Sequence, residues 1–228
     1  MLKDLKKEIL AMADPAQAEF SQRFFKTGKG QYGEGDKFHG GFAVPELRKL
    51  AKKYREMPLE ELGKLISSEF HEQRQIALFI LADHYKKAPE KIVDFYLENL
   101  RFVNNWDLVD SSADRILGDY LFEREKDLLY EFAVSENLWK RRIAIIATFQ
   151  FIKKGVFDDS LRIAEILLAD NQDLIRKAVG WMLREIGKRD ISVLEEFLQK
   201  HCKVMPRTML RYAIEKLEPE KRRFYMER

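Results

Sequence analysis

Apolar residues recur three and four positions apart along most of the chain, as in the run Ile76, Phe79 and Ile80. This spacing places apolar side chains on one face of a helix. Proline stands where helix starts are expected, at Pro45, Pro58, Pro89, Pro206 and Pro219. No segment alternates apolar and polar residues between two turns, so the pattern predicts an all-α chain.

A weak internal repeat runs through the expected helices. Small residues stand at matching positions 34, 33, 34 and 35 residues apart, at Ala77, Ser111, Ala144, Ala178 and Ala213. A regular period in this range, with two helices per unit, indicates a HEAT-like helical solenoid in which each repeat buries its face against its neighbours. Helix pairs of ordinary length would sometimes give such spacing by chance. With 228 residues, the chain is predicted to form one curved repeat domain over residues 1–228.

Arginine occupies one position of three consecutive repeats. The residues two places before the small ones are Gln75, Val109, Arg142, Arg176 and Arg211. Stacked helices would align the three guanidinium groups as a basic stripe, which suits a phosphate backbone without reading its sequence. A solvated face paired with Asp and Glu explains the same pattern equally well, and the repeat alone leaves both interpretations open.

The overall charge is too mild to identify a partner. Lys and Arg total 41 against 38 Asp and Glu, a formal net charge of +3. The longest apolar stretch, Ile76 to Ala82, is much shorter than the roughly 20 residues of a membrane helix. Met1 to Glu8 has no apolar signal core, and Cys202 is the single cysteine. We therefore expect a cytoplasmic protein with no membrane contact and no disulfide.

Residues 27–42 form the one long irregular segment and hold six glycines, of which Gly28, Gly30 and Gly33 make a literal G-x-G-x-x-G pattern. A nucleotide fingerprint requires a preceding strand, and none is predicted here, so we reject a dinucleotide site. Phosphate contact through backbone amides or through Lys29 and Lys37 is one interpretation. A mobile loop leading to the helix that begins near Pro45 is the favoured one.

Metal and thiol chemistry find little support in the sequence. A single cysteine builds no thiolate cluster, and the histidines are scattered, at His39, His71, His84 and His201. Each histidine is expected to be structural or on the surface. Cys202 follows His201 directly, but adjacent residues on a helix point in different directions, so we assign Cys202 no role.

Trp106 and Asp110 are the strongest candidates for chemistry. They stand four residues apart at the start of an expected helix, which places both on one face. Asp110 takes a position that other repeats give mostly to apolar or basic residues. An aromatic face beside a carboxylate can stabilise a developing cation. Core packing by tryptophan and a favourable helix dipole for the aspartate remain the structural alternatives.

Three stretches resemble the DNA alkylation repair family of HEAT-like glycosylases. They are NWDLVDSSADRILGD at 105–119, NLWKRRIA at 137–144 and IRKAVGWMLRE at 175–185. The segment FAVPELRKLAKKY at 42–54 is similar to that family's N-terminal helix on the DNA side. Spacing and order agree across most of the chain, and together the motifs are specific.

The resemblance implies a monomer that removes N3- and N7-alkylated purines from duplex DNA, without a cofactor or metal and without flipping the damaged base. Asp110 would lie near the deoxyribose, and Trp106 and Trp181 would pack against the sugar and its backbone. Arg142 matches the arginine that holds the phosphate near the lesion, and Arg48 matches a position that contacts the DNA backbone, as does Arg184.

One departure from the family concerns the N-terminal helix, where characterised members carry a tyrosine that lines the site. The best match here is Phe24, which keeps the aromatic face and lacks the hydroxyl; Tyr32 in the glycine-rich segment is a candidate substitute. Some relatives bind unusual DNA structures with little or no glycosylase activity. The alternative functions are therefore a non-catalytic module for branched or distorted DNA and, against the arginine pattern, a protein-interaction scaffold.

Overall fold

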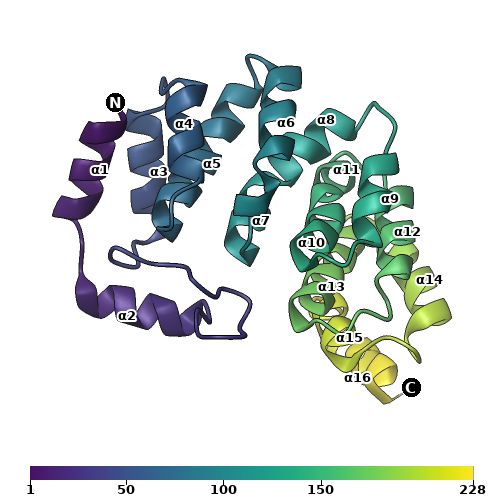
Figure 1. Cartoon of the computed structure of the whole chain (residues 1–228). Coiled ribbons are helices and arrows are strands. Elements are labelled where there is room, and N and C mark those ends of the chain that lie inside the picture. Colours follow the sequence, from purple (N-terminus) through teal and green to yellow (C-terminus); the bar gives the residue numbers. More distant parts are fainter. Residues whose placement is uncertain (228) are drawn as a thin grey trace. The chain divides into compact units, whose positions relative to one another are not determined.

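A computed structural model describes residues 1–227 and shows them as helices joined by loops (Figure 1). The only β-type pairing in this range is an isolated bridge between Lys37 and Phe70. The predicted all-α class is therefore confirmed. None of the helices within residues 1–227 is long and apolar enough to cross a membrane.

The chain divides into two compact units, an N-terminal unit of residues 1–112 and a C-terminal unit that starts at Ala113. The prediction of one continuous curved domain over residues 1–228 stays a prediction. The helices of the N-terminal unit are α1 Leu2–Ala11, α2 Pro15–Phe24, α3 Val44–Lys53, α4 Leu59–Ile66, α5 His71–Tyr85, α6 Pro89–Glu98, the short 3-10 helix η1 Leu100–Phe102 and α7 Trp106–Ser112.

Helix α5 is the centre of the N-terminal unit. It packs against α3, α4, α6 and α7, and its apolar residues Ile76, Leu78 and Ile80 are fully buried. A helix enclosed by neighbours is apolar around much of its circumference, which explains the continuous run at 76–82 that the sequence shows. Burial of each such side chain contributes roughly 1.5–3 kcal/mol of transfer free energy.

The C-terminal unit also has a central helix, α13, with other helices packed around it. It comprises the π-helical turn η2 Asp114–Gly118, α8 Asp119–Leu121, α9 Asp127–Ala133, α10 Leu138–Ala147, α11 Phe149–Lys153, α12 Asp158–Ile166, α13 Asp173–Gly187, α14 Ile191–His201, α15 Arg207–Ala213 and α16 Pro219–Glu227. Helix α13 packs against α10, α14 and α15, and α10 packs against α9.

The small residues of the repeat lie inside helices, as the sequence predicted, with one or more other helical elements between each and the next. Ala77 is in α5, Ala144 in α10, Ala178 in α13 and Ala213 in α15, and all four are buried; Ser111 lies in α7. A small side chain at a helix contact lets two helices approach closely. The helical-repeat fold class is confirmed by these positions.

Proline begins helices where the sequence indicated. Pro89 and Pro219 are the first residues of α6 and α16, and Pro45 is the second residue of α3. Pro58 and Pro206 stand one residue before α4 and α15. The first helical turn has no backbone acceptor for its N–H groups, so the missing proline donor costs nothing there.

The segment 27–42 joins α2 to α3 (Figure 1), and its second half is held against the start of α5. The Lys37 N–H donates to the Glu69 carbonyl at 3.0 Å, and the Lys37 carbonyl accepts the His71 N–H at 2.8 Å. One carboxylate oxygen of Glu72 accepts three consecutive backbone N–H groups, those of His39, Gly40 and Gly41, at 2.9, 3.1 and 3.2 Å. These bonds fix the segment, a constraint that its glycine content did not indicate.

A substitution at Gly180 tests the close contact between α13 and α15. A Cβ atom at Gly180 would lie 2.5 Å from the Met209 carbonyl oxygen and 2.5 Å from the Tyr212 Cβ. We expect Gly180→Ala to lower the free energy of unfolding by about 1–3 kcal/mol in urea denaturation followed by circular dichroism. Gly63 in α4 is the matched control, since its nearest neighbour would be the Phe95 ring at 3.8 Å. Gly63→Ala should raise stability by up to about 1 kcal/mol, and the same effect at both glycines would contradict the close packing.

Candidate active site

The start of α7 carries the two candidate residues Trp106 and Asp110. The Asn105 side-chain oxygen accepts the Trp106 N–H at 2.8 Å, and Asp107 accepts the Leu108 N–H at 2.9 Å. These bonds satisfy N–H groups that a helix start otherwise leaves without acceptors. Trp106 and Asp110 are both half-buried and lie one helical turn apart on the same side of α7.

Aromatic side chains from α2 and the residue after it surround Trp106. The Trp106 ring stacks on Phe25, with centroids 5.4 Å apart and planes 13° from parallel. Phe24 meets Trp106 edge to face at 6.1 Å. Phe24 is itself 55% exposed and stacks on Phe20. The structure therefore brings Phe24 and Trp106 together, and an aromatic face remains open to solvent beside the first turn of α7.

A buried cluster of charged side chains lies directly behind Trp106. The His71 Nδ1 is 3.1 Å from the Asp36 carboxylate, and its Nε2 is 2.8 Å from the Asp107 carboxylate. Arg74 contacts the same Asp36 oxygen at 2.6 Å. The side chains of His71, Asp36 and Arg74 are 2, 3 and 5% exposed, so solvent does not screen these interactions. We call these four residues the His71 cluster.

The His71 cluster strongly perturbs the ionisation of its members. Burial alone would lower the pKa of His71, but the adjacent carboxylates of Asp107 and Asp36 overcome this and raise the pKa from 6.5 to about 9. Burial works to raise the pKa of Asp36, whereas the hydrogen bond from His71 and the charge of Arg74 bring it below its usual value. At neutral pH the cluster thus holds an imidazolium between two carboxylates.

Arg48 lies on α3, apart from the Trp106 aromatic group. Its side chain is exposed, and the guanidinium carbon lies 4.3 Å from the centre of the Phe79 ring. Stacking on an aromatic face leaves the edge of a guanidinium group available for hydrogen bonds. Arg48 can therefore donate to a phosphate while its position is fixed by Phe79.

The C-terminal unit holds Arg142, Trp181 and Arg184. Arg142 is 5% exposed, and one of its nitrogens donates to the Leu174 carbonyl at 2.5 Å. Trp181 is half-buried; its ring lies 5.7 Å from Phe149. Trp181 and Arg184 share α13, and Arg184 forms an ion pair with Glu215.

The three arginines of the repeat each donate to a backbone carbonyl. Arg142 contacts Leu174, Arg176 donates to Asp170 at 2.8 Å and Arg211 donates to Arg207 at 3.3 Å. These arginines therefore have a structural role, and both their alignment as a basic stripe and their contact with phosphate stay predictions.

The sequence did not single out His71, Asp36 or Phe25 for this site. Asp36 lies in the glycine-rich segment and His71 follows it by 35 residues, so no local spacing connects them. For Asp107 the sequence indicates only a favourable charge near a helix start. This contact joins the segment 27–42, the start of α5 and the start of α7, which are far apart in sequence. Such a contact leaves no periodic pattern in the sequence and is seen only in the structure.

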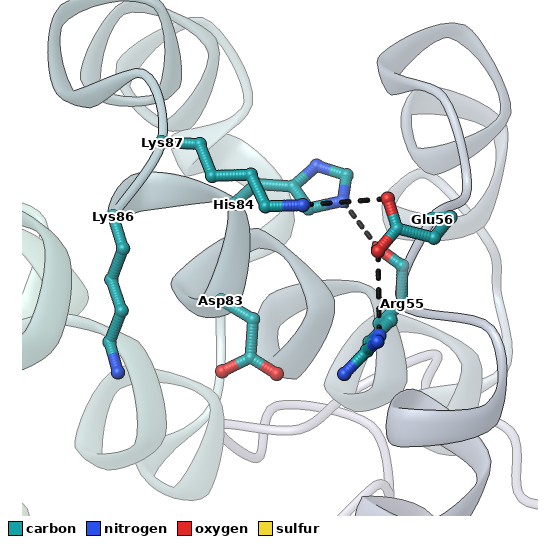
Figure 2. A pocket seen from close by; sticks show the side chains of 6 residues that line it. All are labelled: Arg55, Glu56, Asp83, His84, Lys86 and Lys87. Carbon is teal, nitrogen blue, oxygen red and sulfur yellow. Dashed lines mark hydrogen bonds and ion pairs between the residues drawn. The ribbon is translucent and has the colours of Figure 1, made fainter.

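A hollow of the N-terminal unit lies near the C-terminal end of α5 (Figure 2). It is lined by Arg55, Glu56, Asp83, His84, Lys86 and Lys87. The His84 ring is 2.5 Å from the Arg55 carbonyl, and Lys87 pairs with Glu56 at 3.5 Å. Within residues 1–227 no three His, Cys, Asp or Glu side chains are arranged to hold a metal ion. This hollow is mainly a set of surface ion pairs.

Comparison with known families identifies the chain. The family model described as DNA alkylation repair enzyme matches residues 5–217. The chain belongs to this family. A search of curated proteins gives no match.

Solved structures share the fold of this DNA alkylation repair protein. A predicted DNA alkylation repair enzyme from Enterococcus faecalis is 20% identical, with a TM-score of 0.72 over 91% of this chain and 97% of that one. AlkD2 from Streptococcus mutans is 19% identical, with a TM-score of 0.60 over 78% and 91%. The protein smu.31 from Streptococcus mutans UA159 is 19% identical, with a TM-score of 0.59 over 88% and 98%. At this identity the likeness establishes the fold.

The raised pKa of His71 predicts how stability changes with pH. The folded state holds this proton up to about pH 9, whereas the unfolded chain releases it near 6.5. The stabilisation by His71 is thus complete below pH 6.5 and is lost as the pH rises through 9, with a magnitude on the order of 3 kcal/mol. Urea unfolding at several pH values should show the stability of the wild type falling towards that of His71→Gln. The control His84→Gln should keep the wild-type pH dependence, and a constant gap between wild type and His71→Gln would contradict the prediction.

Proposed function

We propose that this protein is a DNA glycosylase that hydrolyses the N-glycosidic bond of positively charged N3- and N7-alkylated purines in duplex DNA, without flipping the damaged base. Membership of the DNA alkylation repair enzyme family supports repair of alkylated DNA. The observation that carries the finer proposal is the placement of Asp110 and Trp106 on one side of α7, next to the exposed ring of Phe24.

The chemistry needs little beyond charge and orientation. An alkylated purine is cationic and leaves readily: the C1′–N bond breaks, its electron pair goes to the purine nitrogen, and the base departs neutral. The sugar acquires oxocarbenium character. The Asp110 carboxylate stabilises that charge and orients a water molecule, whose oxygen bonds to C1′ while its proton passes to solvent. The aromatic face of Trp106 adds a favourable interaction with the same cation.

The remaining candidate residues would hold the duplex. In this proposal Trp181 packs against the sugar and backbone, while Arg142, Arg48 and Arg184 contact phosphates. Such contacts position DNA without reading base edges, so selectivity comes mainly from the lability of the lesion itself. Phe24 supplies the aromatic face that family members obtain from a tyrosine.

Release of free alkylated base from methylated duplex DNA tests the proposal. Wild-type protein should release base well above the spontaneous rate in buffer, and Asp110→Asn should lower the enzymatic rate by roughly 10²-fold, as loss of an electrostatic stabiliser does elsewhere. Asp94→Asn on α6 is the matched control, because this aspartate is exposed and in the same unit. Its rate should equal that of the wild type.

Two outcomes would contradict the catalytic proposal. Equal rates for wild type and Asp110→Asn would remove the carboxylate from the mechanism. Release no faster than in buffer, from protein that still binds duplex or branched DNA, would instead favour the non-catalytic DNA-binding module.

The salt dependence of DNA binding tests the phosphate contact of Arg48. Removing one phosphate contact should reduce the slope of log K against log salt by about 0.9. We expect this for Arg48→Ala, measured by fluorescence anisotropy with a duplex at several salt concentrations. Arg101→Ala is the matched control, since Arg101 is also exposed, also lies over a phenylalanine ring, that of Phe102, and is not assigned to DNA. Equal slopes for Arg48→Ala and wild type would show that Arg48 makes no phosphate contact.

A further inference from the structure

Trp106 is connected to the interior of the N-terminal unit by two independent routes. The first runs along the chain to the next residue, Asp107, whose carboxylate accepts a hydrogen bond from the Nε2 of His71 at 2.8 Å. The second is through aromatic rings, because Phe25 stacks on Trp106 and also contacts the His71 ring at 4.7 Å. Both routes end at the same imidazole.

His71 is itself fixed on every side. Its Nδ1 faces Asp36 of the segment 27–42, its Nε2 faces Asp107 of α7, and Arg74 of its own helix neutralises Asp36. The rings of Phe25 and Phe38 lie against it, at 4.7 and 4.9 Å. A buried imidazolium enclosed in this way has one orientation, and its two N–H groups join segments that are 71 residues apart in sequence.

We propose that His71 is a positioning residue for the glycosylase reaction: it fixes the Trp106 ring and the first turn of α7, and with them the Asp110 carboxylate, against the segment 27–42. This inference rests on the proposed function. The His71 side chain, 2% exposed, is too deeply buried to contact a duplex itself. It acts through Asp107 and Phe25, both of which adjoin residues assigned to the site.

The charges explain why a histidine serves here. Asp107 is bonded only to His71 and to the backbone of Leu108 among the described residues. Asp36, by contrast, keeps its ion pair with Arg74 when His71 is neutral. Loss of one His71 proton removes the positive charge opposite Asp107 and leaves at most a neutral hydrogen bond between them. The weaker bond favours movement of this half-buried carboxylate towards water and away from the position that orients Trp106.

The indole N–H signals of Trp106, Trp139 and Trp181 in nitrogen-15 NMR report this positioning without requiring activity. Each signal is assigned with a single Trp→Phe variant. His71→Gln should shift the Trp106 signal and leave the other two unchanged, whereas the control His84→Gln, at the far end of α5, should leave all three unchanged. In the wild type the Trp106 signal should titrate with a midpoint near pH 9. An unmoved Trp106 signal in folded His71→Gln would overturn the inference.

Single-turnover base release separates positioning from a purely structural role. With protein in excess over methylated duplex, His71→Gln should release base roughly tenfold more slowly, while its dissociation constant for DNA stays within about threefold of the wild type. His84→Gln should match the wild type in both. A shifted Trp106 signal with an unchanged rate would overturn the link to catalysis.

Asp107→Asn covers the case in which His71→Gln does not fold. It keeps an acceptor for the His71 Nε2 and removes one charge, so the pH midpoint of the Trp106 signal should fall by about one unit or more. An unchanged midpoint would contradict the inference. Wild-type protein that releases no base would sink the glycosylase proposal alone, and the Trp106 signal would still decide whether His71 holds that ring.

Discussion

The first turn of α5 imposes the constraint on which the N-terminal unit depends. Five consecutive polar residues at 71–75 are all buried, although they open the central helix of the core. Polar groups removed from water must be paired, and buried charges most of all. The partners come from outside the helix: Asp36 and the backbone amides of 39–41 on one side, and Asp107 on the other. The arrangement of the segment 27–42 and of α7 follows from this pairing.

The same constraint shows how far sequence reasoning reaches. The helices, their proline starts and the small residues at Ala77, Ala144 and Ala178 are local or periodic features, and each was predicted correctly. The shared helix face of Trp106 and Asp110 belongs to this class, because a four-residue spacing defines a helix face wherever the helix lies, whereas their role in a site stays a prediction. The His71 cluster could not be predicted in this way, since Asp36, His71 and Asp107 are 35 and 36 residues apart and no motif relates them. The glycine-rich segment likewise indicated mobility, and its anchoring by Glu72 required the fold.

The repeated arginines show that a correct pattern can have more than one physical cause. The sequence placed Arg142, Arg176 and Arg211 at one position of the repeat, and left open whether they serve phosphates or the protein surface. Their hydrogen bonds to backbone carbonyls give them a structural role that does not depend on DNA. A guanidinium group with five donors can serve a carbonyl and a phosphate together. Contact of these arginines with phosphate stays a prediction, and Arg142, which is 5% exposed, is the most enclosed of the three.

A cationic leaving group changes what such a site must provide. In the proposed reaction the base departs without prior protonation, so no acid with a tuned pKa is required, and the rate would depend on how well a carboxylate and an aromatic face are aimed at the sugar. Trp106 lies at the start of helix α7, where helical hydrogen bonds fix the backbone least, so contacts with its surroundings set the direction of this first turn. The His71 cluster supplies such contacts through buried ionic hydrogen bonds at the first turn of α7, one turn before Asp110. In this proposal the raised pKa of His71 lies behind the proposed catalytic residues, where the charged imidazole sets their geometry.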